Sequence, residues 1–262
     1  MSLVSPTAPF SLLPYLERAI EDDAAAGLQP LRFFNLDLER VAVPGVWRPS
    51  RLHRCMRANL YKLFDSPRDE HVTFDPVQQN NFMRGHLLGA YAAAVLRLLD
   101  GRWGFSDFVD EGIAHDEASS IGGKKDVTFR KDGVKYVVEV KSKLSDIKDD
   151  MKPEKDHLLQ LNEYLHAEKL PMGFLIYVGP KLVPGTKMKR LWFVEKLQRY
   201  SRELWEESHS RTLQLTWFRR DPSRLAPATG SRWNECPTCP WRESCERGLS
   251  PLQLDSGLSV LL

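Results

Sequence analysis

The sequence has no apolar run that approaches the roughly 20 residues needed to cross a bilayer. Its first ten residues also lack the basic start and the long apolar stretch of a secretory signal. We therefore expect no membrane association and a cytoplasmic location. Strong charge of one sign is missing too, because 37 Lys and Arg against 35 Asp and Glu leave a net charge of +2. Overall charge thus neither requires nor excludes a polyanionic partner.

Cysteine is scarce, with four in 262 residues, and three of the four fall within ten positions of one another near the end of the chain. In a reducing compartment such residues are better interpreted as thiols or metal ligands than as disulfides. The sequence also lacks internal repeats and low-complexity segments. With 42% hydrophobic and 27% charged residues, its composition is ordinary for a protein that buries a core, which argues against disorder.

The order of the expected elements predicts an α/β fold with a mixed sheet and helices on both of its sides. We divide the chain into an N-terminal helical region (1–69), a core (70–215) and a tail (216–262). Helices are expected at 12–26, at about 50–64 with Ser50 as the N-cap, at 81–99 as a long and mostly buried helix, at 153–167, and from 195 to about 209. Strands are expected at 126–130, 134–140, 172–178 and 191–194; proline at positions 44 and 49 breaks the chain, and Gly179-Pro180 ends the third strand.

Asp132-Gly133 is a strong signal for a tight hairpin between the first two strands. If these two residues form the loop, paired positions place Asp126 opposite Glu139. Like charges in facing positions are destabilising unless something compensates them, and a divalent cation would do so. Lys141 lies two residues beyond Glu139 and therefore projects from the same face of the strand.

An Asp, a Glu and a Lys on one face suit phosphodiester hydrolysis. Carboxylates bind Mg2+ or Mn2+, which makes a bound water more acidic, and the lysine can orient that water. The alternative is a solvated strand face with an ordinary ion pair. The run Tyr136-Val137-Val138 and Val140 argues against this alternative, because it predicts a strand buried on both faces, where charges rarely lack partners.

The run Gly122-Gly123-Lys124-Lys125-Asp126, followed by Glu139-Val140-Lys141, resembles the PD-(D/E)xK signature in its RecB-like form. A lysine stands where that signature has proline. The resemblance implies a restriction-endonuclease-like fold and a metal-dependent deoxyribonuclease. In such a site Asp126 and Glu139 bind the metal, the backbone carbonyl of Val140 is a further ligand, and Lys141 assists the nucleophile.

Two further motifs fit the same resemblance: Gly85-His86 on the preceding helix, and Gln160 with Tyr164 on the following one, similar to the Q-x-x-x-Y motif. The resemblance implies that His86 binds the metal or steadies the site, whereas a lone histidine is more often a core residue with a backbone partner. It also implies that Gln160 and Tyr164 lie beside Lys141 and contact DNA. Their spacing alone indicates only a shared polar helix edge.

The cysteines are spaced C-x2-C-x5-C in the tail, at Cys236, Cys239 and Cys245, with Cys55 far upstream. Four thiolates also suit Zn2+, but structural zinc sites usually consist of two close pairs, so this spacing favours a 4Fe-4S cluster. The stretch from Pro49 to Cys55 together with the tail resembles the iron-sulfur nucleases of the CRISPR-associated Cas-four exonuclease group and of AddB. We expect the cluster to join the N-terminal helices to the C-terminal tail.

Relatives of this kind degrade DNA from ends, commonly single-stranded ones, and some trim new spacers with CRISPR integration proteins. The resemblance therefore implies an exonuclease in recombination, repair or antiviral CRISPR processing, and a stand-alone viral or cellular enzyme would carry the same motifs. The rival hypothesis is a catalytically silent DNA-binding or assembly subunit of such a complex. Arg51, Arg54 and Arg57, three apart, could guide a strand or be solvated. Trp233 and Trp241 could stack on bases or cover the cluster.

Overall fold

The computed structural model describes residues 10–25, 47–69, 76–110, 112–230 and 236–255. Its centre is a five-stranded sheet in the order β1-β4-β5-β6-β7. The strands are β1 (Phe105–Asp110), β4 (Val127–Lys131), β5 (Val134–Ser142), β6 (Met172–Leu182) and β7 (Lys189–Arg199). A separate two-stranded ribbon consists of β2 (Ile113–Asp116) and β3 (Ile121–Lys124).

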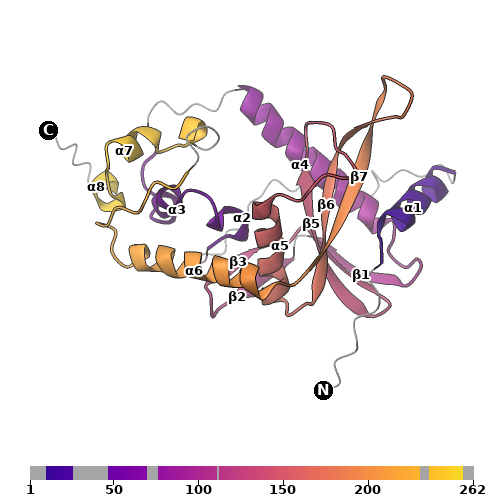
Figure 1. Ribbon diagram of the computed structural model, residues 1–262, viewed down its shortest axis with the longest axis horizontal. Helices are drawn as coiled ribbons and strands as arrows, with labels where there is room; N and C mark the ends of the chain where they lie inside the picture. Colours follow the sequence, from indigo (N-terminus) through magenta and orange to yellow (C-terminus); the bar gives the residue numbers. More distant parts are fainter. Residues whose placement is uncertain (1–9, 26–46, 70–75, 111, 231–235, 256–262) are drawn as a thin grey trace, which may run out of the picture.

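The sheet is mixed because one of its strand pairs is parallel. β5 and β6 run parallel and are connected through the helix α5 (Lys155–Ala167), whereas the other three pairs are antiparallel. A parallel pair requires such a crossover, which leaves its helix on one face of the sheet. α5 therefore lies directly over β5 and β6 (Figure 1).

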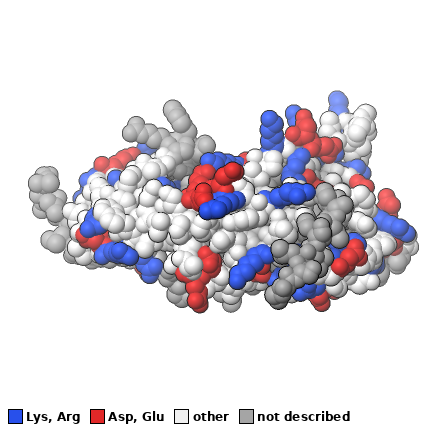
Figure 2. All heavy atoms as spheres, turned by 60° about the horizontal axis from the view of Figure 1, so that its bottom comes forward, with Lys and Arg blue, Asp and Glu red and all other residues white. Residues whose placement is uncertain are grey.

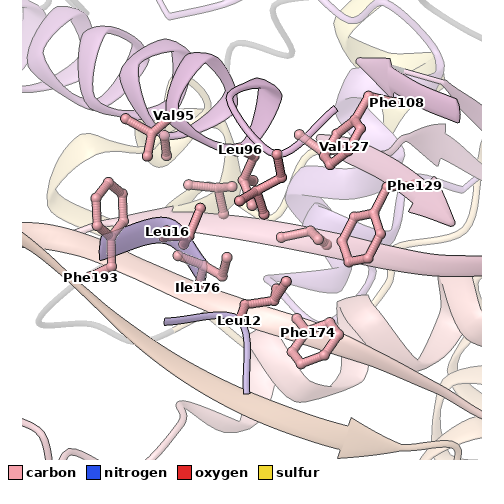
Figure 3. Close-up of a cluster of buried hydrophobic side chains, with 14 of the residues drawn as sticks. Leu12, Leu16, Val95, Leu96, Phe108, Val127, Phe129, Phe174, Ile176 and Phe193 are labelled. Carbon is pink, nitrogen blue, oxygen red and sulfur yellow. The ribbon is translucent and has the colours of Figure 1, made fainter. Parts of the chain in front are cut away.

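One hydrophobic cluster lies on each face of the sheet. One lies beneath α1 (Leu13–Ala25) and α4 (Pro76–Arg97) and contains Val138, Phe174 and Ile176 (Figure 3). The other lies beneath α5 and contains Val137 and Leu175. Neighbouring residues of β5 and β6 thus alternate between the two clusters, as the period of a strand requires. The predicted α/β class, a mixed sheet with helices on both sides, is confirmed.

The elements that contain or adjoin the cysteines gather at the end of the molecule away from β1 (Figure 1): α3 (Met56–Leu63), the 3-10 turn η2 (Cys236–Thr238) and α7 (Arg242–Glu246). The short helices α2 (Pro49–Leu52) and α8 (Pro251–Asp255) precede α3 and follow α7. The helix α6 (Arg202–Arg219) packs against both α5 and α3 and so connects this end to the sheet. A third hydrophobic cluster, which includes Leu52, Leu60 and Leu215, holds α2, α3 and α6 together.

Several predicted boundaries were wrong. The single helix at 50–64 is two helices, because the chain turns at His53–Cys55, where Cys55 has φ −50° and ψ 123° and occupies the N-cap position of α3. Pro49, not Ser50, begins α2. Gly179-Pro180 does not end β6, which continues to Leu182 paired with β7 alone, since β5 stops at Ser142. A strand edge of this kind tolerates proline.

Other predictions differ in length or burial. β7 and α6 are both longer than expected, and α4 is buried only in its second half, because residues 80–84, 86 and 87 are exposed. The expected break at Pro44 and the role of Trp233 lie outside the described residues. Among the described helices, none combines the length and the apolar character that a membrane span requires.

Candidate functional site

The β4–β5 hairpin has the register that its turn predicts. Asp132 and Gly133 both have positive φ, at 51° and 79°, as a two-residue turn of type I′ requires, and Lys131 pairs with Val134. The ladder ends at Val127 opposite Val138, so Asp126 lies one residue before β4 rather than in a ladder pair. Its Oδ2 atom accepts a hydrogen bond of 2.7 Å from the backbone N–H of Val140. The Asp126 carboxylate is therefore held across the end of the hairpin.

Glu139 lies on the face of β5 that α5 covers, and it is only 2% exposed. Burial raises the pKa of its carboxyl to about 8; the negative charge of Asp126 adds to the rise, and Lys141 opposes it. One of its oxygens, Oε2, is buried without a hydrogen-bond partner among the described residues. An unsatisfied buried carboxylate oxygen is costly, and a bound cation would satisfy it.

Lys141 bridges the strand and the helix. Its Nζ atom donates hydrogen bonds to Oε1 of Glu139 at 2.7 Å and to Oε1 of Gln160 at 2.6 Å. The Gln160 amide in turn donates to the hydroxyl of Tyr164 at 3.3 Å, and that hydroxyl donates to the backbone carbonyl of Lys124 at 2.9 Å. The chain of bonds fixes the position of the lysine ammonium relative to the two carboxylates.

The two residues that resemble the Q-x-x-x-Y motif, Gln160 and Tyr164, are thus buried beside Lys141. Gln160 is 6% exposed and Tyr164 is 2% exposed. Burial, followed by the charge of Glu139, raises the pKa of Tyr164 well above its usual value, so its hydroxyl stays protonated and can donate. In this arrangement both residues position Lys141, and their contact with DNA stays a prediction.

His86 is exposed on α4, next to Gly85, whose backbone approaches the side chain of Ser142 so closely that an added Cβ would lie 3.1 Å from its Oγ atom. Ser142 alternates with Lys141 along β5 and so belongs to the opposite face of the strand. The predicted metal-binding role of His86 stays a prediction.

Sequence reasoning missed His157, which lies on α5 one turn before Gln160. Its Nδ1 atom is 3.0 Å from the hydroxyl of Tyr177, and its pKa is lowered to about 4 by burial and then by the positive charge of Lys141. The imidazole is therefore neutral at neutral pH. The spacing of three residues from Gln160 is the signal that could have placed it on the same helix face.

The packing of α2 against the site was also missed. A Cβ on Gly123 would lie 2.9 Å from Cδ of Pro49 and 3.1 Å from the Tyr164 hydroxyl. The backbone of Gly123 is therefore pressed between α2 and α5, and a side chain at this position would separate them. Two glycines before the Lys124-Lys125-Asp126 stretch are consistent with such an approach, but sequence alone does not name the neighbour.

The four cysteines come from the start of α3, from η2 and from α7. Burial raises the pKa of Cys239, and the charges of Cys55, Cys245 and Cys236 raise it further, so the four thiols share one region. The guanidinium of Arg57 donates to the carbonyl of Cys245 at 2.8 Å and to its sulfur at 3.2 Å. The structure thus brings Cys55 to the tail, as the sequence predicted.

Polar contacts dock the tail on the segment that follows α3. The carboxylate of Asp69 accepts hydrogen bonds from the backbone N–H groups of Glu243 at 2.7 Å and Ser244 at 3.3 Å. The indole of Trp241 donates to the carbonyl of Ser66 at 3.1 Å, and Trp241 is only 6% exposed. Of the two roles considered for Trp241, stacking on bases is excluded by this burial.

The side chains as they stand do not surround an ion: within the described residues, no three or more His, Cys, Asp or Glu side chains are arranged to hold a metal. The donor sets nevertheless fit the expected groups. The unsatisfied Oε2 of Glu139, near the carboxylate of Asp126, suits a hard divalent cation. Four neighbouring thiols suit an iron-sulfur cluster or zinc.

No protein-family model matches the sequence, and no curated protein matches it either. Among solved structures, the chain is similar to one titled as the crystal structure of SSO0001, with 18% identity over 90% of this chain and 95% of that chain and a TM-score of 0.49. It is also similar to an alkaline exonuclease (LHK-Exo) from Laribacter hongkongensis, with 13% identity over 70% of this chain and 96% of that chain and a TM-score of 0.38. At these identities and scores neither likeness assigns a function to this chain.

Proposed function

We propose that this chain is a metal-dependent deoxyribonuclease that hydrolyses DNA phosphodiester bonds, acting as an exonuclease on single-stranded ends. The observation that supports the proposal most directly is the buried Glu139 carboxyl, with one oxygen unsatisfied, beside Asp126 and Lys141. A purely structural ion pair would satisfy both oxygens of a carboxylate that is so deeply buried.

Asp126 and Glu139 would hold a Mg2+ or Mn2+ ion, and the Val140 carbonyl is a further ligand in this proposal. When bound, the ion supplies a more acidic water and neutralises charge on the phosphate. Lys141 orients the attacking water and offsets the negative charge that develops on the phosphate oxygens. Gln160 and Tyr164 keep the Lys141 ammonium in place. In this proposal His86 binds the metal or steadies the site.

Cys55, Cys236, Cys239 and Cys245 would hold a 4Fe-4S cluster that clasps the N-terminal helices to the tail. This role is structural in the proposal, because the cysteines lie with α3 and α7 rather than with Glu139. Iron analysis and the visible absorption spectrum of protein purified without oxygen would distinguish iron from zinc. We place the enzyme in recombination, repair or CRISPR spacer processing, where CRISPR integration or recombination proteins would be its partners.

The test is cleavage of end-labelled single-stranded and double-stranded DNA with Mg2+, Mn2+ or chelator. Glu139→Ala and Lys141→Ala should each abolish metal-dependent cleavage and leave the fold and iron content unchanged. Lys135→Ala is the matched control, because Lys135 lies on the same face of β5 but pairs with Glu168. Cleavage by either active-site variant at the wild-type rate would refute the assignment. Metal-independent binding of DNA by a wild-type protein that never cuts it would favour the silent subunit instead.

A further inference from the structure

Two arginines of the α2–α3 segment, Arg54 and Arg57, have different roles in the structure. Arg57 is used internally, because its Nε atom donates to the carbonyl of Ala226 at 2.7 Å and its Nη1 atom donates to Cys245. Arg54 is exposed, and among the described residues its guanidinium has no hydrogen-bond or ion-pair partner. The backbone at Arg54 is nevertheless fixed, because its carbonyl accepts a hydrogen bond of 2.7 Å from Arg211.

The turn that carries Arg54 is anchored to the helix of the candidate site. His53, one residue earlier, contacts Oε1 of Glu163 at 3.0 Å and Oγ of Ser208 at 2.9 Å through its Nε2 atom. Glu163 is buried on α5 between Gln160 and Tyr164, the two residues that position Lys141. Cys55, one residue later, belongs to the cysteine group. Of three consecutive residues, His53 therefore contacts Glu163 of α5, Arg54 is exposed to solvent, and Cys55 belongs to the cysteine group.

The turn that carries Arg54 lies near the helix that holds Gln160. α2 abuts the site through Pro49, which lies against Gly123. The lowered pKa of His157, caused first by burial and then by Lys141, has smaller contributions from Lys143 and Arg54. An open groove of about 520 Å³ lies beside this turn, and its lining includes His53, Lys155 and Arg211 as well as the acidic side chains of Asp156 and Glu207.

Two cations near the site already have carboxyl partners, whereas the Arg54 guanidinium has none among the described residues: Lys141 pairs with Glu139, and Lys143 pairs with Glu154. Blue and red side chains are intermingled over the face drawn in Figure 2, so no broad positive surface is available there to attract DNA. A guanidinium without a partner among the described residues is well suited to phosphate binding, because it can donate two parallel hydrogen bonds to phosphate oxygens.

We propose that Arg54 binds a backbone phosphate of the DNA strand adjacent to the phosphate held at Glu139 and Lys141, which makes the turn before Cys55 part of the substrate site. The inference rests on the proposed nuclease function. In this arrangement the cysteine group fixes the distance between one phosphate-binding residue and the reacting phosphate.

The test compares Arg54→Gln and Arg54→Lys with the wild type, and uses Arg202→Gln as a control, because Arg202 is an exposed arginine of α6 that pairs with Glu206. Binding of a fluorescein-labelled single-stranded oligonucleotide is followed by anisotropy in chelator at several salt concentrations. Arg54→Gln should weaken binding about tenfold and reduce the salt slope by about 0.7, the value for one contact to a single strand. Arg54→Lys should retain most of the slope, and Arg202→Gln should match the wild type.

With Mn2+, Arg54→Gln should raise KM about tenfold and leave kcat within about twofold, because the contact lies outside the reacting group. Iron content and melting temperature should equal those of the wild type, which excludes a merely structural effect. Wild-type binding, salt slope and KM in Arg54→Gln would overturn this inference and leave the nuclease proposal intact. A wild type that does not bind DNA would refute both, whereas one that binds but does not cleave would refute the nuclease proposal alone.

Discussion

Asp126 accepts a hydrogen bond from the backbone N–H of Val140 across the end of the β4–β5 hairpin, at 2.7 Å. Asp126 is not paired in the β4–β5 ladder, and this hydrogen bond therefore holds its carboxylate near Glu139 on β5. The side chain has two effects in the metal-free protein. It satisfies a backbone donor, and it places a negative charge near a buried carboxyl.

Replacing Asp126 by Asn and by Ala separates these two effects. Asn keeps an acceptor for Val140 and removes the charge, so its stability in chelator should equal or exceed that of the wild type by about 0.2 to 1 kcal/mol. Ala leaves the N–H unpaired and should lose about 1 to 3 kcal/mol. Urea unfolding in chelator measures both. Equal loss in the two variants would mean that the hydrogen bond does not hold the aspartate in solution.

Gln160→Ala should slow DNA cleavage about tenfold, because Lys141 loses one of the two acceptors that fix its ammonium. The control is Gln198→Ala, since Gln198 is also buried and donates to the carbonyl of Leu158, but lies on β7. The two variants should lose similar stability. The rate of DNA cleavage should fall below that of the wild type only in Gln160→Ala. Equal cleavage rates in the two variants would show that the position of Lys141 does not depend on Gln160.

The pKa of about 8 at Glu139 predicts a pH-dependent stability of the metal-free protein. The folded pKa is raised above the unfolded value of 4.5, so this stabilising contribution is complete below about pH 4.5 and is lost as the pH rises through 8. Within this window the free energy of unfolding should fall by about 1.4 kcal/mol per pH unit from this group. Glu139→Gln removes that contribution.

Urea unfolding of the wild type and Glu139→Gln in chelator, from pH 5 to pH 8, checks this prediction. The stability of the variant relative to the wild type should rise steadily with pH. Mg2+ or Mn2+ should stabilise the wild type increasingly at higher pH, since the ion displaces the proton. Parallel stability curves for the two proteins would contradict the raised pKa.

Cys55→Ser should lose iron and thermal stability to the same extent as a serine at Cys236, Cys239 or Cys245. All four residues close the same long loop, and by analogy with a disulfide the closure contributes about 4 to 5 kcal/mol. Ser66→Ala is a suitable control, because Ser66 lies beside Trp241 and its hydroxyl has no hydrogen-bond partner among the described residues. Full iron content in Cys55→Ser would show that Cys55 is not a ligand of the cluster.

The parts of the fold that sequence predicted correctly are those with local causes. The turn at Asp132-Gly133 sets the hairpin register through its own backbone angles, and the alternation along β5 follows from burial on two faces. From these two features the neighbourhood of Asp126, Glu139 and Lys141 could be inferred. The spacing of Gln160 and Tyr164 similarly placed both residues on one helix face.

The incorrect predictions depend on contacts between distant segments. The helix expected at 50–64 breaks at His53–Cys55, where the chain must reach Glu163 and the tail cysteines together. Local helix propensity does not depend on those distant partners, so it could not predict the break. β6 passes Pro180 because β5 has already ended, which depends on the length of another strand. The glycines at 122 and 123 are consistent with a close neighbour, but nothing local identifies that neighbour as Pro49.

The docking of the tail on the segment after α3 bears on the order of events in maturation. Asp69 and Trp241 hold the two segments together through polypeptide contacts alone, and Arg57 reaches across to Cys245. In the proposed iron-sulfur protein, these contacts would bring the cysteines of the tail towards Cys55 without help from the cluster. Cluster transfer would then follow the folding of the chain rather than direct it.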